Sequence, residues 1–141
     1  MKSRRSAAIV GVAAATWVIP VLFFAGCGDS GPERGEVTGT VTLDGQPLAE
    51  ATVEFQPQEG APSYGETDAQ GRYRLGYTPE KPGAVVGKHT VSITTGRMKG
   101  PPGSQEEVPE RVPPEYNTES TVTREVQPGE NVFDFPIQTS P

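Results

Sequence analysis

Few residues of this chain have side chains suited to covalent catalysis. Its 141 residues include one cysteine, Cys27, and one histidine, His89. A single cysteine excludes an intramolecular disulfide and a cysteine-cluster metal site. A single histidine excludes His-pair zinc motifs and leaves one candidate general base. His89 alternates in phase with Val91 and Ile93, so we expect it in or beside the core. With neither a nucleophile elbow nor a P-loop, the sequence predicts no catalytic residues, no enzyme activity and no cofactor.

Two acidic turns raise the question of a metal site. Asp44 precedes Gly45, and Asp68 begins the turn that ends at Gly71. Calcium requires six to eight oxygen ligands, and the dense alternating Asp loop that usually supplies them does not occur here. Asp followed by Gly also suits an ordinary turn, because Gly takes positive φ and Asp bonds nearby backbone. We expect turn roles for both residues, with calcium as the weaker alternative.

Three tyrosines are candidates for binding a ligand through their rings. Tyr64, Tyr77 and Tyr116 could stack on sugar rings, whereas the only tryptophan, Trp17, lies in the N-terminal segment. Packing at the core or its rim is the other interpretation. Tyr116 in particular could anchor its loop through ring burial and a phenol hydrogen bond.

The N-terminus has the layout of a secretory signal. Lys2, Arg4 and Arg5 precede an uncharged, mostly apolar stretch, and small residues precede Cys27. The run Phe24-Ala25-Gly26-Cys27 resembles a bacterial lipobox, with Phe24 where Leu is usual. The resemblance implies a lipoprotein signal peptide over 1–26, lipidation of Cys27 and a flexible tether over 27–35. An uncleaved transmembrane helix is the alternative.

Net charge limits the partners. The chain carries −6, and removal of residues 1–26 leaves nine basic against eighteen acidic residues, about −9. An acidic body does not favour nucleic acid or an anionic membrane surface, so we expect attachment through the lipid alone. If sorting resembles that of proteobacteria, Gly28 rather than Asp after Cys27 implies the outer membrane. The expected location is the cell envelope, with the body facing the periplasm or the exterior.

The rest of the chain has the pattern of short strands. Seventeen glycines and fifteen prolines oppose helices, and β-branched and aromatic residues alternate with polar ones between turn signals. We predict an all-β, seven-stranded Greek-key sandwich with strands at 36–43, 49–56, 64–67, 72–77, 88–95, 121–126 and 131–137. Its expected core comprises Val41, Val53, Phe55, Leu75, Val91, Ile93, Phe133 and Phe135.

The segment 96–114 interrupts the strand pattern. Its nineteen residues include five prolines and three glycines. A loop of this length is usually either functional or disordered. We predict a mobile surface loop, and a partner-contacting loop is the alternative, because Pro-rich chain loses little entropy on docking.

Several segments in order resemble a known family. They are Gly39-Thr-Val-Thr-Leu-Asp-Gly-Gln-Pro-Leu48, Thr67-Asp-Ala-Gln-Gly-Arg-Tyr73, Gly87-Lys-His-Thr-Val91, Pro113-Pro-Glu-Tyr-Asn117 and Glu125 to Phe135. Residues 35–138 resemble the carboxypeptidase regulatory-like domain, and the chain looks most like small lipoproteins of this kind in planctomycete-type bacteria. The resemblance implies a transthyretin-like or immunoglobulin-like sandwich over 36–138 and a non-catalytic binding role.

These observations predict a lipid-anchored, non-catalytic envelope module that binds or scaffolds. Its expected partners are the membrane, through the lipid, and an unidentified envelope protein or glycan. The alternative is a carbohydrate- or peptide-binding accessory subunit of a separate secreted enzyme.

Overall fold

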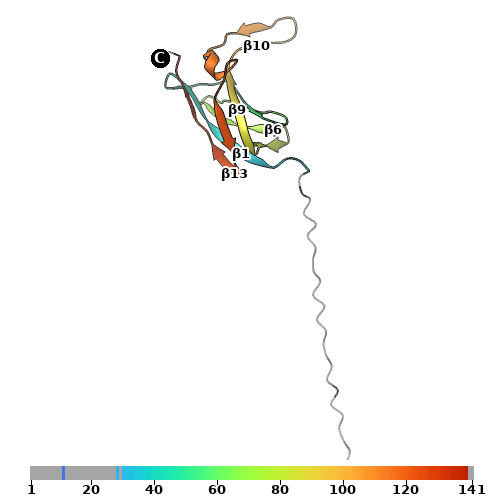
Figure 1. Ribbon diagram of the computed structural model, residues 1–141. Coiled ribbons are helices and arrows are strands. Elements are labelled where there is room, and N and C mark those ends of the chain that lie inside the picture. Colours follow the sequence, from blue (N-terminus) through green and yellow to red (C-terminus); the bar gives the residue numbers. More distant parts are fainter. Residues whose placement is uncertain (1–10, 12–27, 29, 140–141) are drawn as a thin grey trace, which may run out of the picture. The chain divides into compact units, whose positions relative to one another are not determined.

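The computed structural model describes Gly11, Gly28 and residues 30–139. Short strands joined by tight turns account for most of 34–137 (Figure 1). The elements are β1 (Arg34–Leu43), β2 (Gln46–Pro47), β3 (Thr52–Pro57), β4 (Ser63–Glu66), β5 (Arg72–Arg74), β6 (Gly76–Thr78), β7 (Lys81–Pro82), β8 (Ala84–Val85), β9 (Gly87–Thr94), β10 (Arg97–Lys99), β11 (Glu106–Val108), the 3₁₀ helix η1 (Pro114–Tyr116), β12 (Thr123–Val126), β13 (Gly129–Val132) and β14 (Phe135–Ile137). The all-β prediction is confirmed.

The first sheet is organised around β1. One edge of β1 pairs in parallel with the C-terminal strands β13 and β14. Its other edge pairs antiparallel with β8, β5 and β2. A ten-residue strand with β-branched residues at alternate positions can serve both edges along its whole length. β1 is therefore the spine of this sheet.

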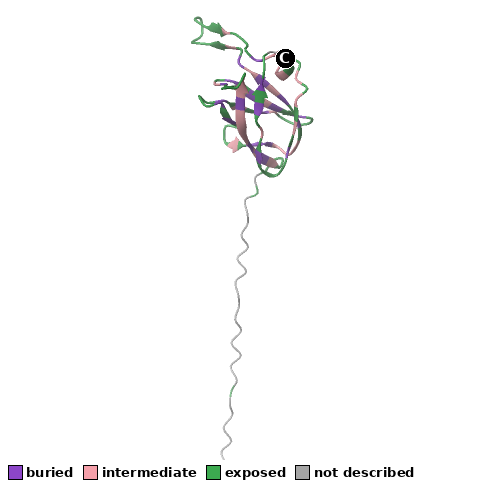
Figure 2. Cartoon of the chain, turned by 90° about the vertical axis from the view of Figure 1, so that its left-hand side faces the viewer, coloured by how far each residue is buried: buried purple, intermediate pink, exposed green. Residues whose placement is uncertain are grey.

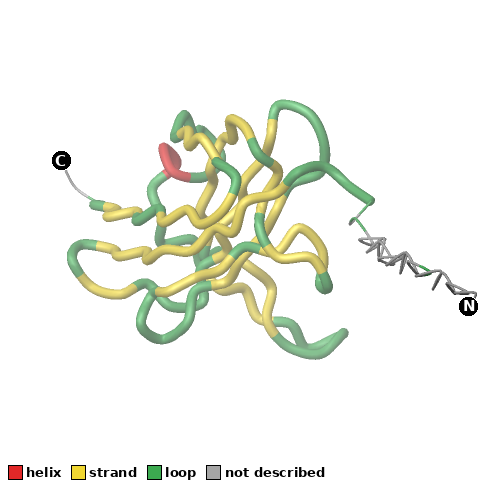
Figure 3. The backbone as a smooth tube through the Cα atoms, turned by 90° about the horizontal axis from the view of Figure 1, so that it is seen from below, coloured by secondary structure: helices red, strands yellow, loops and turns green. Residues whose placement is uncertain are grey.

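The second sheet is antiparallel throughout, in the order β12-β9-β3-β4-β6-β7. The longest pairing joins β3 to β9, from Thr52 opposite Thr94 to Pro57 opposite His89. Along the sequence, the chain crosses from one sheet to the other several times (Figure 3). Such crossing connections are those of a Greek-key sandwich.

One apolar core lies between the sheets, where the buried residues of both gather (Figure 2). Phe55 of the second sheet is fully buried and lies 5.9 Å from the ring of Phe133 and 6.3 Å from that of Phe135 in the C-terminal segment. Every predicted core residue is buried except Phe133, which is partly buried and packs against the cluster. Buried residues that the sequence pattern did not select include Val37, Leu48, Ala51, Val126 and Ile137.

Each predicted strand segment contains a strand, but two of the seven are divided. The predicted 72–77 strand contributes β5 to the first sheet and β6 to the second, with buried Leu75 between them. The predicted 131–137 strand breaks at Asp134, whose carboxylate accepts hydrogen bonds of 2.9 Å from the backbone N–H and the hydroxyl of Thr40. Strand β1 also begins at Arg34, two residues inside the segment predicted as tether.

Candidate functional site

His89, the one candidate general base, lies in the core as predicted. It is 1% exposed, and its ring lies 5.7 Å from that of Phe55. Its Nε2 lies 2.6 Å from the carbonyl oxygen of Val85, so Nε2 carries the proton that is donated there. Buried Nδ1 has no hydrogen-bond partner among the residues that the structure describes. The His89 ring is thus part of the packed core and does not face solvent.

The two calcium candidates, Asp44 and Asp68, accept hydrogen bonds from backbone N–H groups. Asp44 accepts hydrogen bonds from the backbone N–H and the hydroxyl of Thr139, at 2.9 and 2.6 Å. Asp68 accepts hydrogen bonds of 2.9 Å from the backbone N–H groups of Gln70 and Arg72. These bonds lower the pKa of both carboxyls, through the Thr139 hydroxyl for Asp44 and the Arg72 amide for Asp68. Over the described part of the chain, no three His, Cys, Asp or Glu side chains gather in a way that could hold a metal.

The three tyrosine candidates have different surroundings. Tyr116 lies in η1, and its side chain packs against the core. Tyr77 is half-buried, with the guanidinium of Arg34 5.7 Å from its ring centre. Tyr64 is 49% exposed, and its hydroxyl donates a long hydrogen bond of 3.4 Å to Glu54. Of the three, Tyr64 presents its ring most openly to solvent.

The segment predicted as a long mobile loop contains an ordered hairpin. Strands β10 and β11 pair antiparallel, from Arg97 opposite Val108 to Lys99 opposite Glu106. Their turn is closed by a 3.0 Å hydrogen bond from the Ser104 N–H to the Pro101 carbonyl, and Gly103 takes a φ of +87° as a type II turn requires. We call residues 97–108 the arm. The run Gly100-Pro101-Pro102-Gly103 at this turn contributes to the loop-like composition of the segment.

A caged carboxylate fixes one side of the arm's base. Glu110 accepts hydrogen bonds from the backbone N–H and the hydroxyl of Thr95, at 3.0 and 2.9 Å, and from the N–H of Gly96 at 3.1 Å. The N–H groups of Arg111 and Val112 donate to the same carboxylate at 3.0 and 2.8 Å. Partial burial raises the pKa of Glu110, but the backbone N–H groups of Val112, Thr95 and Gly96 outweigh it and hold the pKa below its ordinary value.

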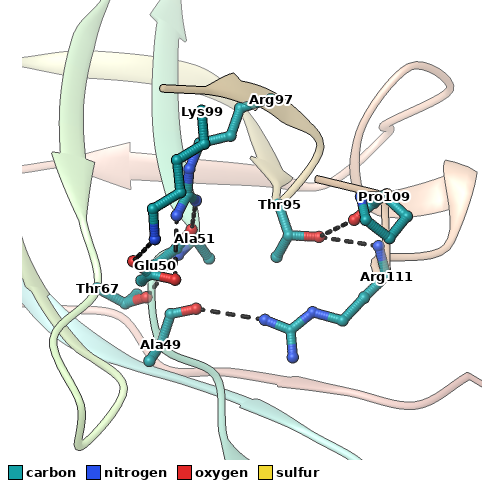
Figure 4. A network of polar contacts seen from close by, with 9 residues as sticks. All are labelled: Ala49, Glu50, Ala51, Thr67, Thr95, Arg97, Lys99, Pro109 and Arg111. Carbon is teal, nitrogen blue, oxygen red and sulfur yellow. Dashed lines mark hydrogen bonds and ion pairs between the residues drawn. The ribbon is translucent and has the colours of Figure 1, made fainter. Parts of the chain in front are cut away.

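Ion pairs fix the other side of the base (Figure 4). Glu50 lies 3.1 Å from the Arg97 guanidinium and 3.6 Å from the Lys99 ammonium. The Lys99 and Arg97 charges lower the pKa of Glu50. Arg111 donates to the Ala49 carbonyl at 3.4 Å, and the Thr95 hydroxyl accepts the Arg111 N–H at 2.8 Å. Strand β10 and the segment that follows β11 are thus both tied to the loop before β3.

The arm and the start of β1 lie at opposite ends of the sandwich (Figure 1). β8 pairs with Arg34 and Gly35, and β9 begins two residues after β8. β9 then runs for eight residues, about 26 Å, and ends at the arm. Met98 on the arm is 56% exposed. The arm therefore presents an apolar contact at the end remote from Arg34.

Glu110→Gln should loosen the arm and remove its acid sensitivity. Because the folded pKa lies below the ordinary value of 4.5, Glu110 stabilises the fold above that pH, and this contribution is lost as the pH falls through the depressed pKa. At pH 7 we expect amide protection factors at Thr95, Gly96 and Val112 to fall about 3–10-fold in the variant. Hydrogen exchange from pH 3 to 7 checks this. The amides that bond Asp68 serve as a control, and unchanged protection at all three positions would contradict the cage.

Cys27 and its lipobox lie outside the described residues, as does the apolar segment apart from Gly11. No helix in the part that is described has the length and apolar character to cross a membrane. The lipid anchor therefore remains a prediction.

Comparisons with known proteins add one structural similarity. No family model matches the sequence, and no curated protein matches it. A DUF3823 family protein from Parabacteroides merdae is similar in structure, with 15% sequence identity and a TM-score of 0.41. The match covers 76% of this chain and 47% of that one, so this chain spans less than half of the neighbour's length.

Proposed function

We propose that this protein is a lipid-anchored, non-catalytic module of the cell envelope that presents a rigid binding arm to a partner. The observation that carries the proposal is the locked arm. Its base is held by the Glu110 cage and by the ion pairs of Glu50, and its exposed Met98 lies at the far end of the sandwich from Arg34. An arm ordered before binding loses little entropy when a partner docks on it.

The anchor and the family belong to the same proposal. The lipobox ending at Cys27 supports acylation, and Gly28 supports placement in the outer membrane. The order of segments over 35–138 supports membership among the carboxypeptidase regulatory-like lipoproteins, and the all-β sandwich agrees with that fold class. A lipid at Cys27 would connect to the sandwich through the residues that lead into β1.

A carbohydrate- or peptide-binding accessory role is the second candidate. It is favoured by the open ring of Tyr64 on the outer face of the second sheet. In this role the sandwich would hold substrate for a separate secreted enzyme.

Photo-crosslinking in intact cells tests the arm. A photoreactive amino acid at Met98 should give one discrete product with an envelope protein, and the same group at Val132, which is 69% exposed on β13, should not. Combining Glu50→Ala with Glu110→Gln should reduce the Met98 product at least about threefold, because it releases both sides of the base. Equal products at Met98 and Val132, or no discrete product, would overturn the role of the arm.

A further inference from the structure

The outer face of the second sheet carries an exposed aromatic ring within a polar row. Tyr64 on β4 lies opposite Glu54 on β3, and Glu54 lies opposite Ser92 on β9. Glu54 links the row, accepting the Tyr64 hydroxyl at one oxygen and the Ser92 hydroxyl at the other, each at 3.4 Å. The row is thus a ring followed by a carboxylate and a hydroxyl, across three adjacent strands.

The ring is uncovered on its other flank. Its partner on β6 is Gly76, which has no side chain to lie against the tyrosine. The register places Thr52 and Gln56 on the same face of β3 as Glu54, and Thr90 beside Gln56. Tyr64 therefore stands on a sheet face that also carries hydroxyl, amide and carboxylate groups.

This combination suits a sugar ring. The C–H face of a pyranose is apolar and packs against an aromatic face. Its hydroxyls both donate and accept, so they match a carboxylate, an amide and hydroxyls arranged along neighbouring strands. We propose that the face formed by Tyr64, Glu54 and Ser92 binds a saccharide without formal charge. This inference deepens the proposed function by naming a ligand class, and it requires the protein to be a binding module but does not involve the arm.

Charge selects among saccharides. Glu54 lies beside the ring, and Glu66 is two residues further along β4. An acidic sugar would be repelled by these carboxylates, whereas a neutral one would hydrogen-bond to them.

The outer face of the first sheet offers a competing location. A hollow of about 670 Å³ there is lined by Thr38, Thr40, Arg72, Arg74, Val132 and Asp134 among others. Its arginines already form ion pairs, Arg72 with Asp68 at 3.3 Å and Arg74 with Glu36 at 2.9 Å. None of its aromatic residues is exposed, since Tyr73 is 4% exposed. The Tyr64 face is therefore the better saccharide platform, and Val132 supplies a matched control.

Affinity electrophoresis of the full-length protein in mild detergent tests the proposal. The gels contain xylan, β-glucan, mannan or glycol chitin as neutral probes, and alginate or polygalacturonate as acidic ones. We expect retardation by at least one neutral polysaccharide. Tyr64→Ala should weaken it about tenfold or more, as removal of a central aromatic contact does, whereas Tyr64→Phe and Val132→Ala should bind within about threefold of the natural chain.

Four outcomes would overturn the inference. They are no retardation by any neutral probe, retardation by acidic probes alone, equal binding by Tyr64→Ala, and a loss that occurs in Val132→Ala instead. Light scattering of the natural chain and Tyr64→Ala adds another test, because a ring that merely joins two copies would alter the molar mass. Since Tyr64 is exposed, its replacement should leave folding intact, and circular dichroism verifies this. Crosslinking at Met98 is unaffected by any of these results, so failure of this site is distinguishable from failure of the arm.

Discussion

Cys27→Ala should abolish lipid attachment and either leave the chain unprocessed, with residues 1–26 still attached, or move it out of the membrane fraction. The thioether that holds the lipid forms on the sulfur of this residue, and the chain has no second cysteine to replace it. Each buried methylene of an acyl chain contributes about 0.8 kcal/mol, so loss of the lipid removes most of the membrane affinity of an acidic body. Detergent-phase partitioning and intact mass spectrometry measure this directly. The natural chain should enter the detergent phase. Its mass should be that of residues 27–141 with the acyl chains attached.

The unprocessed variant separates the two interpretations of the N-terminus. A cleaved lipoprotein requires the cysteine, whereas an uncleaved apolar helix does not. If Cys27→Ala stays in the membrane with unchanged mass and processing, the transmembrane alternative is correct. Met98→Ala, which alters an exposed residue of the arm, is the control and should be acylated normally.

An anchor at Cys27 would leave the sandwich close to the membrane. Arg34 follows Cys27 by seven residues, and a fully extended segment of that length spans at most about 23–25 Å. Within the sandwich, the arm lies at the other end of β9, which is about 26 Å long. The Tyr64 face lies along the side of the sandwich between these ends. Two separate binding surfaces could thus be used at once by an envelope protein and a glycan.

Local alternation explains which parts of the fold the sequence revealed. The stretch from Glu36 to Leu43 and that from Lys88 to Thr95 alternate without interruption, and both are long strands. The division at Asp134 was not foreseeable, because it depends on Thr40, ninety-four residues earlier. At that point Gly39 approaches the C-terminal segment so closely that an added Cβ would lie 1.9 Å from the Phe133 carbonyl oxygen. Alternation of apolar and polar residues indicates which face of the sheet a side chain lies on. It does not indicate which strand pairs with that residue's strand.

The arm was missed for a related reason. Its strands are three residues long and its turns hold Pro and Gly, so composition alone indicated a loop. Its order comes from Glu50, some fifty residues earlier, and from Glu110, which bonds the backbone on both sides of its base. A carboxylate that cages backbone N–H groups has no characteristic spacing in a sequence. For the tyrosines the sequence supplied three equal candidates, and burial distinguishes Tyr64 from the other two.

Phe55→Ala should cost about 3–5 kcal/mol in the free energy of unfolding. The side chain is fully buried and contacts the rings of His89, Phe133 and Phe135, so it joins β3 to β9 and to the C-terminal segment. Removal of the ring loses its burial and leaves a cavity that rigid strands on both sides cannot close. A small domain is stable by only about 5–15 kcal/mol, so the variant should be mostly folded at low temperature and unfold well below the natural chain.

Urea unfolding followed by tyrosine fluorescence and by circular dichroism measures the loss. Phe55→Leu retains most of the volume and should lose less than half as much, whereas Val132→Ala, on the solvent face, should change the midpoint little. A loss below about 1 kcal/mol for Phe55→Ala would mean that the two sheets do not depend on this contact. Because His89 packs on the same ring and its Nε2 bonds the Val85 carbonyl, the variant should also release β8 from its place beside β1. If the variant loses more amide protection near Val85 than on the arm, the core and the arm are stabilised separately.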